Sequence, residues 1–212
     1  MTKQKLILIG GGGHCKSCID VIESTAKFEI LGIIDIPQLL GTKILNYKII
    51  GNDNDIENFA KEDISFLVTI GQIKNAELRL NLHKKVLATN GKFATVIAKT
   101  AYVSKHSSIG ENTIIMHNAI VNANAKIGDG CIINTNTNIE HDTVINDYCH
   151  ISTGAIVNGT CTIGEKCFIG SQAMIANNIS IAPECIIGAA SAVYKNIPSK
   201  GTYFGNPAKL VK

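Results

Sequence analysis

The sequence predicts a small α/β domain followed by a coil of short parallel strands, a parallel β-helix. Three observations lead to this fold class. An unbroken six-residue repeat fills the second half of the chain, the first 96 residues alternate apolar runs with helical patterns instead, and glycines follow the first apolar run. Of the 212 residues, 45% are hydrophobic and 17% are charged, a composition that suffices for a buried core and excludes a disordered chain.

The repeat places Ile or Val at every sixth position from Ile97 to Val193, at seventeen positions without an insertion. The residue four places further along is mostly small, as at Ala119, Cys131 and Thr137. A period of six fits neither an α-helix nor a simple alternating strand, but it fits short parallel strands joined by turns, three to a coil. We therefore expect between five and six coils, stacked about 4.8 Å apart, whose aliphatic and small residues face a narrow interior.

Six of the seven cysteines follow two patterns. Four of them are spaced by 18 residues and should form one inward column, where a free cysteine acts as a small buried hydrophobe: Cys131, Cys149, Cys167 and Cys185. Cys15 and Cys18 form a C-x-x-C motif, for which a redox or zinc role is the alternative to plain packing. The odd count and the lack of an export signal favour reduced thiols.

The first 96 residues should form a small parallel sheet with helices, because strand and helix patterns alternate along them. The patterns predict strands at 6–9, 31–35, 65–70 and 93–97, and helices at 14–24, 53–61 and 75–90. The last helix has an apolar stripe of Leu78, Leu82 and Val86. The predicted domains are residues 1–96, residues 97–198 and a C-terminal tail at 199–212.

Glycines 10–13 lie between the first strand and the first helix, and His14 follows them. Glycines allow the backbone to approach an anion, and a helix N-terminus presents free N–H groups, so this arrangement is typical of phosphate binding. Asp35 ends the next strand, where a carboxylate can meet a nucleoside hydroxyl or a base edge. The alternative is a glycine-rich tight turn without a ligand.

Two of the six histidines stand out, because neither occupies an inward slot of the repeat. His141 is third in its hexapeptide and is followed by Asp142, whose carboxylate can orient an imidazole; His150 is sixth. His117 is also third in its hexapeptide and His106 is fourth. The alternative for each is a solvated ring on the surface of the coil.

Taken together, these motifs resemble the bacterial sugar acetyltransferases of the left-handed β-helix class. That family includes UDP-4-amino-sugar (bacillosamine-type) N-acetyltransferases and sialic-acid O-acetyltransferases. The resemblance covers nearly the whole chain and is carried by residues 8–14, 32–35, 69–71 with Arg79, 139–142, 150–152 and 204–209. One departure is Ile36, where some members carry a second acid.

The resemblance implies a left-handed coil, acetyl-CoA as co-substrate and no metal. It implies that His141 is the general base, that Asp142 tunes it, and that His150 contacts the acetyl carbonyl of acetyl-CoA. It also implies that the N-terminal domain binds a nucleotide sugar, with substrate contacts from Gly11, Gly12, Gly13, His14, Asp35, Gly71 and Arg79. We expect the acetyl-CoA to lie along the C-terminal coils, beside Gly159, Gly188, Ala189 and Lys209.

The expected chemistry is direct acyl transfer. An amine or hydroxyl that attacks a thioester loses a proton, which an imidazole can accept at neutral pH. The tetrahedral oxyanion needs hydrogen-bond donors, which backbone N–H groups or His150 could supply. The cysteines lie mostly in inward slots, so no acyl-enzyme is expected.

The uninterrupted repeat also bears on assembly. No long loop can protrude from the coil, so substrate contacts must come from the N-terminal domain, the C-terminal tail or another subunit. His141 and His150 are nine residues apart, or one and a half faces, and can meet only around an edge or across a subunit boundary. A prism with three flat sides packs naturally as a closed trimer, so we expect a homotrimer with three active sites between neighbours.

Three functions remain open at this point. The first is acetyl transfer from acetyl-CoA to the amino group of a UDP- or dTDP-linked 4-amino-4,6-dideoxy sugar, and the second is O-acetylation of sialic acid or a related surface-polysaccharide sugar. The third is a zinc hydratase or a non-catalytic scaffold on the same coil. A hydratase needs three convergent histidines, whereas His117 and His141 do not stack and no third completes a set.

Charge and hydropathy set the expected environment. The net charge is only +3 and just 11 residues are aromatic, so the sequence does not predict nucleic-acid binding. No apolar run approaches the roughly 18 residues of a membrane span, and the stretch at residues 6–9 is too short for a signal peptide. We expect a cytoplasmic protein.

Overall fold

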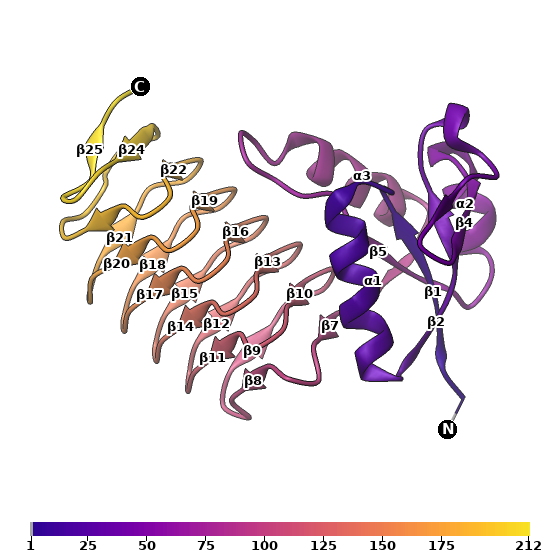
Figure 1. Cartoon of the computed structure of the whole chain (residues 1–212), viewed down its shortest axis with the longest axis horizontal. Coiled ribbons are helices and arrows are strands. Elements are labelled where there is room, and N and C mark those ends of the chain that lie inside the picture. The colour runs from indigo at the N-terminus through magenta and orange to yellow at the C-terminus, as the bar shows by residue number, and fades with distance from the viewer. Residues whose placement is uncertain (1) are drawn as a thin grey trace.

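The computed structural model describes residues 2–212 and shows an α/β domain beside a parallel β-helix (Figure 1). The sheet of the N-terminal domain has the strand order β3-β4-β2-β1-β5-β6, in which only the β3–β4 pair is antiparallel. Its strands are β1 (Gln4–Ile9), β2 (Phe28–Ile34), β3 (Lys43–Ile44), β4 (Tyr47–Gly51), β5 (Ser65–Val68) and β6 (Lys92–Phe93). Its helices are α1 (Gly13–Thr25), α2 (Ile56–Ala60) and α3 (Glu77–Ala88), with short 3-10 turns at Pro37–Leu39 and Asp53–Asp55.

Most elements of this domain lie where the sequence predicts them, with three exceptions. The strand predicted at 93–97 is divided into β6 of this sheet and β7 (Val96–Ile97) of the β-helix. The β3–β4 hairpin was not predicted. The apolar stripe of α3 was wrong at Leu78, which is 57% exposed. The inward face of α3 instead carries Arg79, Leu82, His83 and Val86. Two polar residues thus take inward positions on α3, because this helix packs toward the β-helix as well as onto its own sheet.

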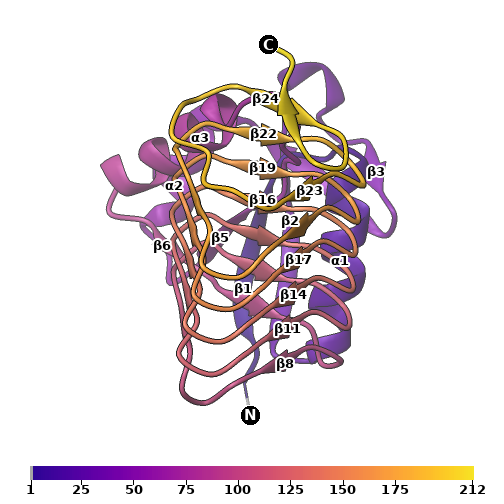
Figure 2. The same cartoon turned by 90° about the vertical axis from the view of Figure 1, so that its left-hand side faces the viewer.

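The β-helix contains one two-residue strand for each predicted hexapeptide, from β7 to β23. Residues 18 apart pair in parallel, as Ile115 does with Ile133 and Ile133 with Ile151. The coils therefore stack with three strands per turn and show three sides (Figure 2). The repeated aliphatic residues, the small residues and five cysteines fill the interior, and all seven cysteines of the chain are buried and free.

Successive residues of a strand point to opposite faces, so each two-residue strand has one residue inside the coil and one outside. The outside residues differ between the three sides of the coil. The covered face is formed by β7 (Val96–Ile97), β10 (Ile114–Ile115), β13 (Ile132–Ile133), β16 (His150–Ile151), β19 (Phe168–Ile169) and β22 (Ile186–Ile187). The apolar face is formed by β8 (Tyr102–Val103), β11 (Ile120–Val121), β14 (Asn138–Ile139), β17 (Ile156–Val157), β20 (Met174–Ile175) and β23 (Ala192–Val193). The polar face is formed by β9 (Ser108–Ile109), β12 (Lys126–Ile127), β15 (Val144–Ile145), β18 (Thr162–Ile163) and β21 (Ser180–Ile181).

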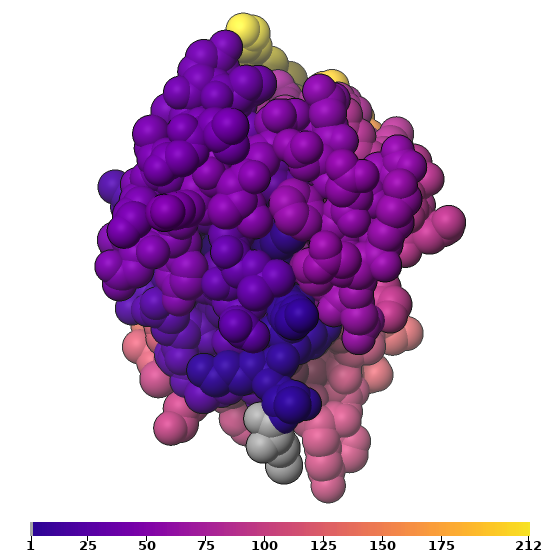
Figure 3. All heavy atoms as spheres, turned by 90° about the vertical axis from the view of Figure 1, so that its right-hand side faces the viewer, coloured from indigo at the N-terminus to yellow at the C-terminus, as the bar shows by residue number. Residues whose placement is uncertain are grey.

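The N-terminal domain packs on the covered face. Val96, Ile114 and Ile132 point outward from this face and are buried in one cluster with Cys15, Cys18 and other residues of α1. The C-x-x-C motif is therefore a packing element, and burial raises the pKa of both thiols. Viewed from the side of the N-terminal domain, this domain lies across the coil behind it (Figure 3).

The β-helix begins with β7 at Val96, beside the predicted domain boundary at residue 97. The predicted tail adds two strands to the covered face, β24 (Thr202–Phe204) and β25 (Lys209–Leu210), so it closes the C-terminal end of the coil. Among residues 2–212, none of the helices has the length and apolar character needed to span a bilayer.

Candidate active site

The glycine turn lies at the carboxyl end of β1, where open α/β sheets bind ligands. Gly10 has a φ of +100°, and a Cβ there would lie 2.2 Å from Ile70, so only glycine fits. Gly12 and Gly13 are exposed, and a Cβ on either would meet nothing within 4 Å. The first turn of α1 thus opens onto free space, as a bound phosphate requires.

Asp35 fixes the shape of this turn. Its carboxylate accepts hydrogen bonds from the backbone N–H of Gly11 at 2.5 Å and of Ile36 at 2.7 Å. The predicted contact of Asp35 with a nucleoside stays a prediction, since both oxygens already have a backbone partner.

A second wall of the site is the loop after β5. Thr69 donates its hydroxyl hydrogen to the carbonyl of Gly10 at 2.7 Å, and Gly71 lies 3.5 Å, measured to its ideal Cβ, from the Cβ of His14. Burial, and then the charge of Arg79, lowers the pKa of His14 to about 4. Its Nε2 is buried and has no hydrogen-bond partner among residues 2–212, which marks a polar group available to a ligand.

His150 lies on the covered face, against this same loop. Its Nδ1 lies 2.6 Å from the carbonyl oxygen of Gln72, and its Nε2 lies 3.2 Å from the amide Nδ2 of Asn134. A carbonyl oxygen only accepts, so Nδ1 carries the proton and Nε2 accepts a hydrogen bond from Asn134. Burial is the main reason that the pKa of His150 falls to about 4. This neutral tautomer has no hydrogen on Nε2, so it does not supply the oxyanion donor considered above.

Arg79 is buried between the two domains. Its guanidinium donates to the side-chain oxygen of Gln72 at 2.8 Å and to the carbonyl of Gly130 in the β-helix. The side-chain amide of Gln72 in turn donates to the carbonyls of Lys166 and Cys167. The contacts that the structure gives Arg79 therefore join the domains, and its predicted contact with substrate stays a prediction.

His141 lies in the turn between β14 and β15, on the edge shared by the apolar and polar faces. Its side chain is 56% exposed, and its Nδ1 lies 2.8 Å from a carboxylate oxygen of Asp142. Asn124, one coil earlier, donates to the other oxygen of Asp142 at 2.6 Å. The hydrogen bonds from Asn124 and His141 hold the pKa of Asp142 below its usual value, so the carboxylate is ionised and keeps the Nε2 of His141 free to accept a proton.

Gly159 lies one coil after His141 in the same column of turn residues. A Cβ on Gly159 would lie 2.8 Å from both Cε1 and Nε2 of His141. Because residue 159 is a glycine, there is room for the ring of His141 beside the coil. Asn177, one coil further, lies 3.4 Å from the same hypothetical Cβ.

Two of the remaining predicted acetyl-CoA residues lie on the other edge of the apolar face, whereas Lys209 lies in β25. Gly188 and Ala189 occupy the turn between β22 and β23. A Cβ on Gly188 would lie 2.0 Å from the ring of Phe204, so this glycine admits the packing of β24 and has no open surface for pantetheine. Ala189 and Lys209 are exposed, and their predicted contacts stay predictions.

The site residues thus fall into two groups within one chain. We name the two groups after their predicted roles, the base group and the acyl group. The base group is His141, Asp142 and Gly159, on the edge between the apolar and polar faces. The acyl group is His150, Asn134 and Ala189, at the edge between the covered and apolar faces, next to the glycine turn: the rings of His14 and His150 are 6.2 Å apart. Among residues 2–212, His141 and His150 have no hydrogen-bond partner in common. His141 lies on the corner of the three-sided coil that is opposite the covered face, on which His150 lies.

Gln72 and Asn134 were missed from the sequence. Gln72 directly follows residues 69–71, which carry the resemblance, and Asn134 precedes His150 by 16 residues, close to the 18-residue coil period. The coil period alone could have placed Asn134 near His150, whereas the contact of the Gln72 carbonyl depends on how the two domains pack.

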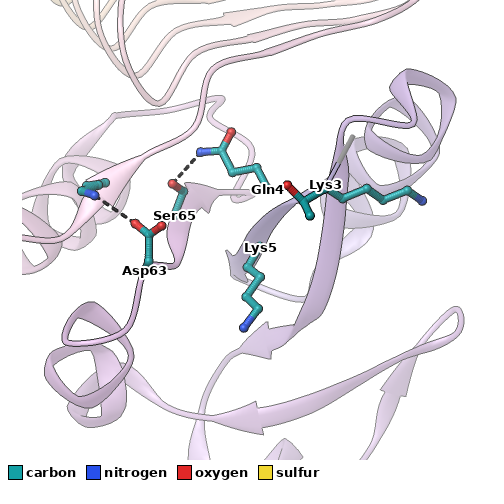
Figure 4. A pocket seen from close by; sticks show the side chains of 7 residues that line it. Lys3, Gln4, Lys5, Asp63 and Ser65 are labelled. Carbon is teal, nitrogen blue, oxygen red and sulfur yellow. Dashed lines mark hydrogen bonds and ion pairs between the residues drawn. The ribbon is translucent and has the colours of Figure 1, made fainter.

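Two other features lie elsewhere. A pocket of about 490 Å³ opens at the amino-terminal edge of the sheet, lined by Lys3, Lys5, Ser65 and the Asp63–Lys92 ion pair (Figure 4). It lies at the opposite end of the strands from the glycine turn. Within residues 2–212, no three His, Cys, Asp or Glu side chains are grouped so as to hold a metal ion.

Comparison with known proteins covers both domains. Residues 5–86 match the family model described as PglD N-terminal domain, and residues 106–139 match the bacterial transferase hexapeptide (six repeats) model. The acetyltransferase domain of PglB from Neisseria gonorrhoeae FA1090 is 28% identical, with a TM-score of 0.92 and coverage of 99% of this chain and 100% of that one. PerB from Caulobacter crescentus, solved with CoA and GDP-perosamine, is 26% identical, with a TM-score of 0.90 and coverage of 100% and 99%.

Over nearly its whole length the chain is similar to hexapeptide-repeat acyltransferases. The predicted family, the left-handed β-helix with its Rossmann-like N-terminal domain, and the predicted enzyme class are confirmed. WeeI from Acinetobacter baumannii AYE shares the fold of this acyltransferase at 23% identity, with a TM-score of 0.86 and coverage of 99% and 100%. No curated protein sequence is significantly similar to this chain.

Proposed function

We propose that this acyltransferase transfers the acetyl group of acetyl-CoA to the amino group of a nucleotide-linked 4-amino-4,6-dideoxy sugar. The observation that carries the proposal is the pair of His141 and Asp142, exposed on one edge of a coil whose full-length relatives are acetyltransferases. The neisserial domain was also solved with acetyl coenzyme A, and a Caulobacter relative with GDP-perosamine. The glycine turn and the open N-terminus of α1 suit the diphosphate of such a substrate.

In this reaction His141 acts as the general base. Asp142 holds Nδ1–H, and Nε2 takes the proton that the amine loses as its nitrogen attacks the thioester carbonyl. The C–S bond then breaks, the protonated His141 returns its proton to the sulfur, and CoA leaves as the thiol, so no acyl-enzyme forms. The negative oxygen of the tetrahedral intermediate takes its hydrogen bonds from backbone N–H groups or from the amide of Asn134.

The apolar face supports a homotrimer. Its outward residues Tyr102, Ile120 and Ile156 are 60%, 40% and 39% exposed in the single chain, whereas the covered face is buried by the N-terminal domain and the polar face carries Ser108, Lys126 and Thr162. Large exposed apolar patches mark interaction surfaces. A closed ring of three chains with the apolar faces inward buries this surface in three equivalent contacts.

Such a ring also completes the site. Each apolar face has the base group on one edge and the acyl group on the other, so a threefold axis brings the base edge of one chain against the acyl edge of the next. His141 of one chain then faces His150, Asn134 and the glycine turn of its neighbour. The predicted acetyl-CoA residues Gly159 and Ala189, which lie on opposite edges, converge only in this way.

The assembly is tested by mixing two inactive variants. His141→Ala and His150→Ala are coexpressed with different tags, and mixed trimers are isolated by tandem purification. Sites shared between chains predict recovery of about a third of the wild-type activity, because each mixed trimer then has one of its three sites with both histidines intact. A lack of recovery in mixed trimers would contradict sites between chains.

The substrate is tested by acetylation of a panel. The panel pairs UDP-, dTDP- and GDP-linked 4-amino-6-deoxy sugars with CMP-sialic acid and free sialic acid, and CoA release and product mass are measured. Amide formation on one nucleotide amino sugar is the expected result. Ester formation on sialic acid, with no reaction of the amines, would replace this proposal by O-acetylation. Thermal stabilisation by UDP, dTDP or GDP alone identifies the base that the N-terminal domain recognises.

A further inference from the structure

The buried interface between the domains contains a chain of hydrogen bonds that ends at His150. Arg79 of α3 donates to the side chain of Gln72, and Gln72 donates to two carbonyls of the β-helix and offers its own carbonyl to His150. Arg79 and Gln72 are 3% and 2% exposed. Groups this deeply buried are held in one arrangement, since an unpaired donor there costs about 1–3 kcal/mol.

We propose that Arg79 is a positioning residue for acyl transfer: acting through Gln72, it keeps His150 in the Nδ1–H tautomer with Nε2 directed to Asn134 as a hydrogen-bond acceptor. The proposal deepens the proposed function, on which it rests for the role of His150 at the acyl group. The Gln72 carbonyl lies 2.6 Å from Nδ1, and a carbonyl cannot donate, so this contact alone selects the tautomer.

The position of that carbonyl depends on Arg79. The loop at residues 69–76 joins β5 to α3, and beyond Val68 only Thr69 still donates to β1, at the carbonyl of Ile9. Further along this loop, Gln72 is held by contacts of its side chain, of which the guanidinium–amide bond at 2.8 Å is the shortest and the one that involves a charged group. Loss of this bond frees Gln72, and the carbonyl is then no longer fixed on Nδ1.

The tautomer determines what His150 offers a ligand. An acceptor Nε2 holds one hydrogen of the Asn134 amide and has no hydrogen of its own to donate to the thioester carbonyl. The carbonyl takes its donor instead from Asn134, whose Nδ2 carries a second hydrogen, or from the backbone. The same loop lines the glycine turn through Thr69 and Gly71, so nucleotide sugar and acyl group lie on two sides of one short segment.

The test reads the tautomer directly in the ligand-free protein. Histidine labelled with 15N in both ring positions gives one set of ring signals for each of the six histidines, and the His150→Gln variant assigns the set of interest. Long-range 1H–15N spectra at pH 7 should show the wild-type ring protonated at Nδ1 only. In Arg79→Met the signal should become that of a tautomer mixture, and Arg79→Lys, which can reach only one of its two acceptors, should lie between.

Asn112→Ala is the matched control. Asn112 is buried, lies at the same interface and contacts Nδ1 of His83 at 3.0 Å, so its loss weakens domain packing without touching Gln72. Its His150 signal should stay that of the wild type. A pure Nδ1–H signal in both Arg79 variants, an Nε2–H signal in the wild type, or a change in Asn112→Ala equal to that in Arg79→Met would overturn the proposal. If Arg79→Met does not fold, the Arg79→Lys signal decides by the same criterion.

Kinetics separate this proposal from the proposed function. In Arg79→Met the KM for acetyl-CoA should rise about tenfold, with a smaller change in kcat, because a ligand contact and not the base is displaced. A changed tautomer in a protein that acetylates no amino sugar would leave the positioning role intact and reject the proposed substrate. An unchanged tautomer in Arg79→Met, in an enzyme that acetylates an amino sugar, would reject the positioning role and leave the proposed substrate intact.

Discussion

His141 and His150 are nine residues apart on the same coil, yet their surroundings differ in every respect. His141 is more than half exposed, and its ring forms a hydrogen bond with the carboxylate of Asp142. Among residues 2–212, no residue of the N-terminal domain forms a hydrogen bond with this ring. His150 is 7% exposed, has both ring nitrogens paired and lies against the N-terminal domain. An exposed imidazole with one free nitrogen can accept a proton from a substrate, whereas a buried ring with both nitrogens paired positions a ligand.

The largest expected effect is loss of the base. His141→Ala should lower kcat by about 10²–10⁴-fold, because general-base catalysis contributes that much. CoA release in a steady-state assay measures the effect, and light scattering checks that the assembly is unchanged. His106→Ala, an exposed histidine of the same coil outside the site, serves as the control. Turnover within a few-fold of the wild type in His141→Ala would remove His141 from the role of base.

The next effect tests whether the two histidines act across a subunit boundary. Ile156→Glu places a charge in the centre of the apolar face, where burial of an unpaired charge costs about 3–5 kcal/mol, so the trimer should dissociate and activity should fall to near background. Sedimentation measures the assembly. Thr162→Glu on the polar face, in the strand that follows, should remain an active trimer. An active monomer of Ile156→Glu would mean that one chain contains the whole site.

A smaller effect is expected at Gly159, which lies next to the ring of His141. In Gly159→Ala the new Cβ would lie 2.8 Å from Nε2 and Cε1 of His141, so the ring must turn away from the coil. Misplacement of a catalytic group by about 1 Å costs up to roughly 10²-fold, so kcat should fall by about 10- to 100-fold with KM for the sugar little changed. Unchanged kcat would show that the position of the ring over Gly159 is not the reactive one.

The contrast between the two histidines also separates what the sequence could predict from what it could not. The place of His141 follows from the repeat alone: residues in its slot lie on turns, and Asp142 is adjacent in the chain. The interior of the coil is equally local, since a strict period of six places Ile133 on Ile151 without reference to any other part of the molecule. Regular, local patterns of this kind predict both burial and exposure.

The surroundings of His150 depend on residues distant in sequence. Its partner Gln72 is 78 residues away, and Arg79 and His83 take inward positions on α3 because they meet the β-helix, whereas Leu78, an apolar residue, faces solvent. An apolar stripe predicts the buried face of a helix only where that face packs on a single apolar core. Here α3 also contributes to a polar interface between domains, and no pattern within residues 77–88 shows this.

The smallest expected effect is a change in pH dependence on loss of Asn124, which donates a hydrogen bond to Asp142. Asn124 donates to Asp142 at 2.6 Å, and this bond is the main cause that holds the pKa of the carboxyl below its usual value. A depressed pKa keeps Asp142 ionised as the pH falls; without Asn124 the pKa rises, and the carboxylate is protonated at a higher pH. In Asn124→Ala the acid limb of kcat/KM should therefore move to higher pH, with a loss of only about two- to threefold at pH 7, the size expected for one exposed hydrogen bond. Asn136→Ala, at a turn position of the other edge, should leave the limb in place. A limb that moves to lower pH, or equally in both variants, would show that Asp142 does not act on His141 through its charge.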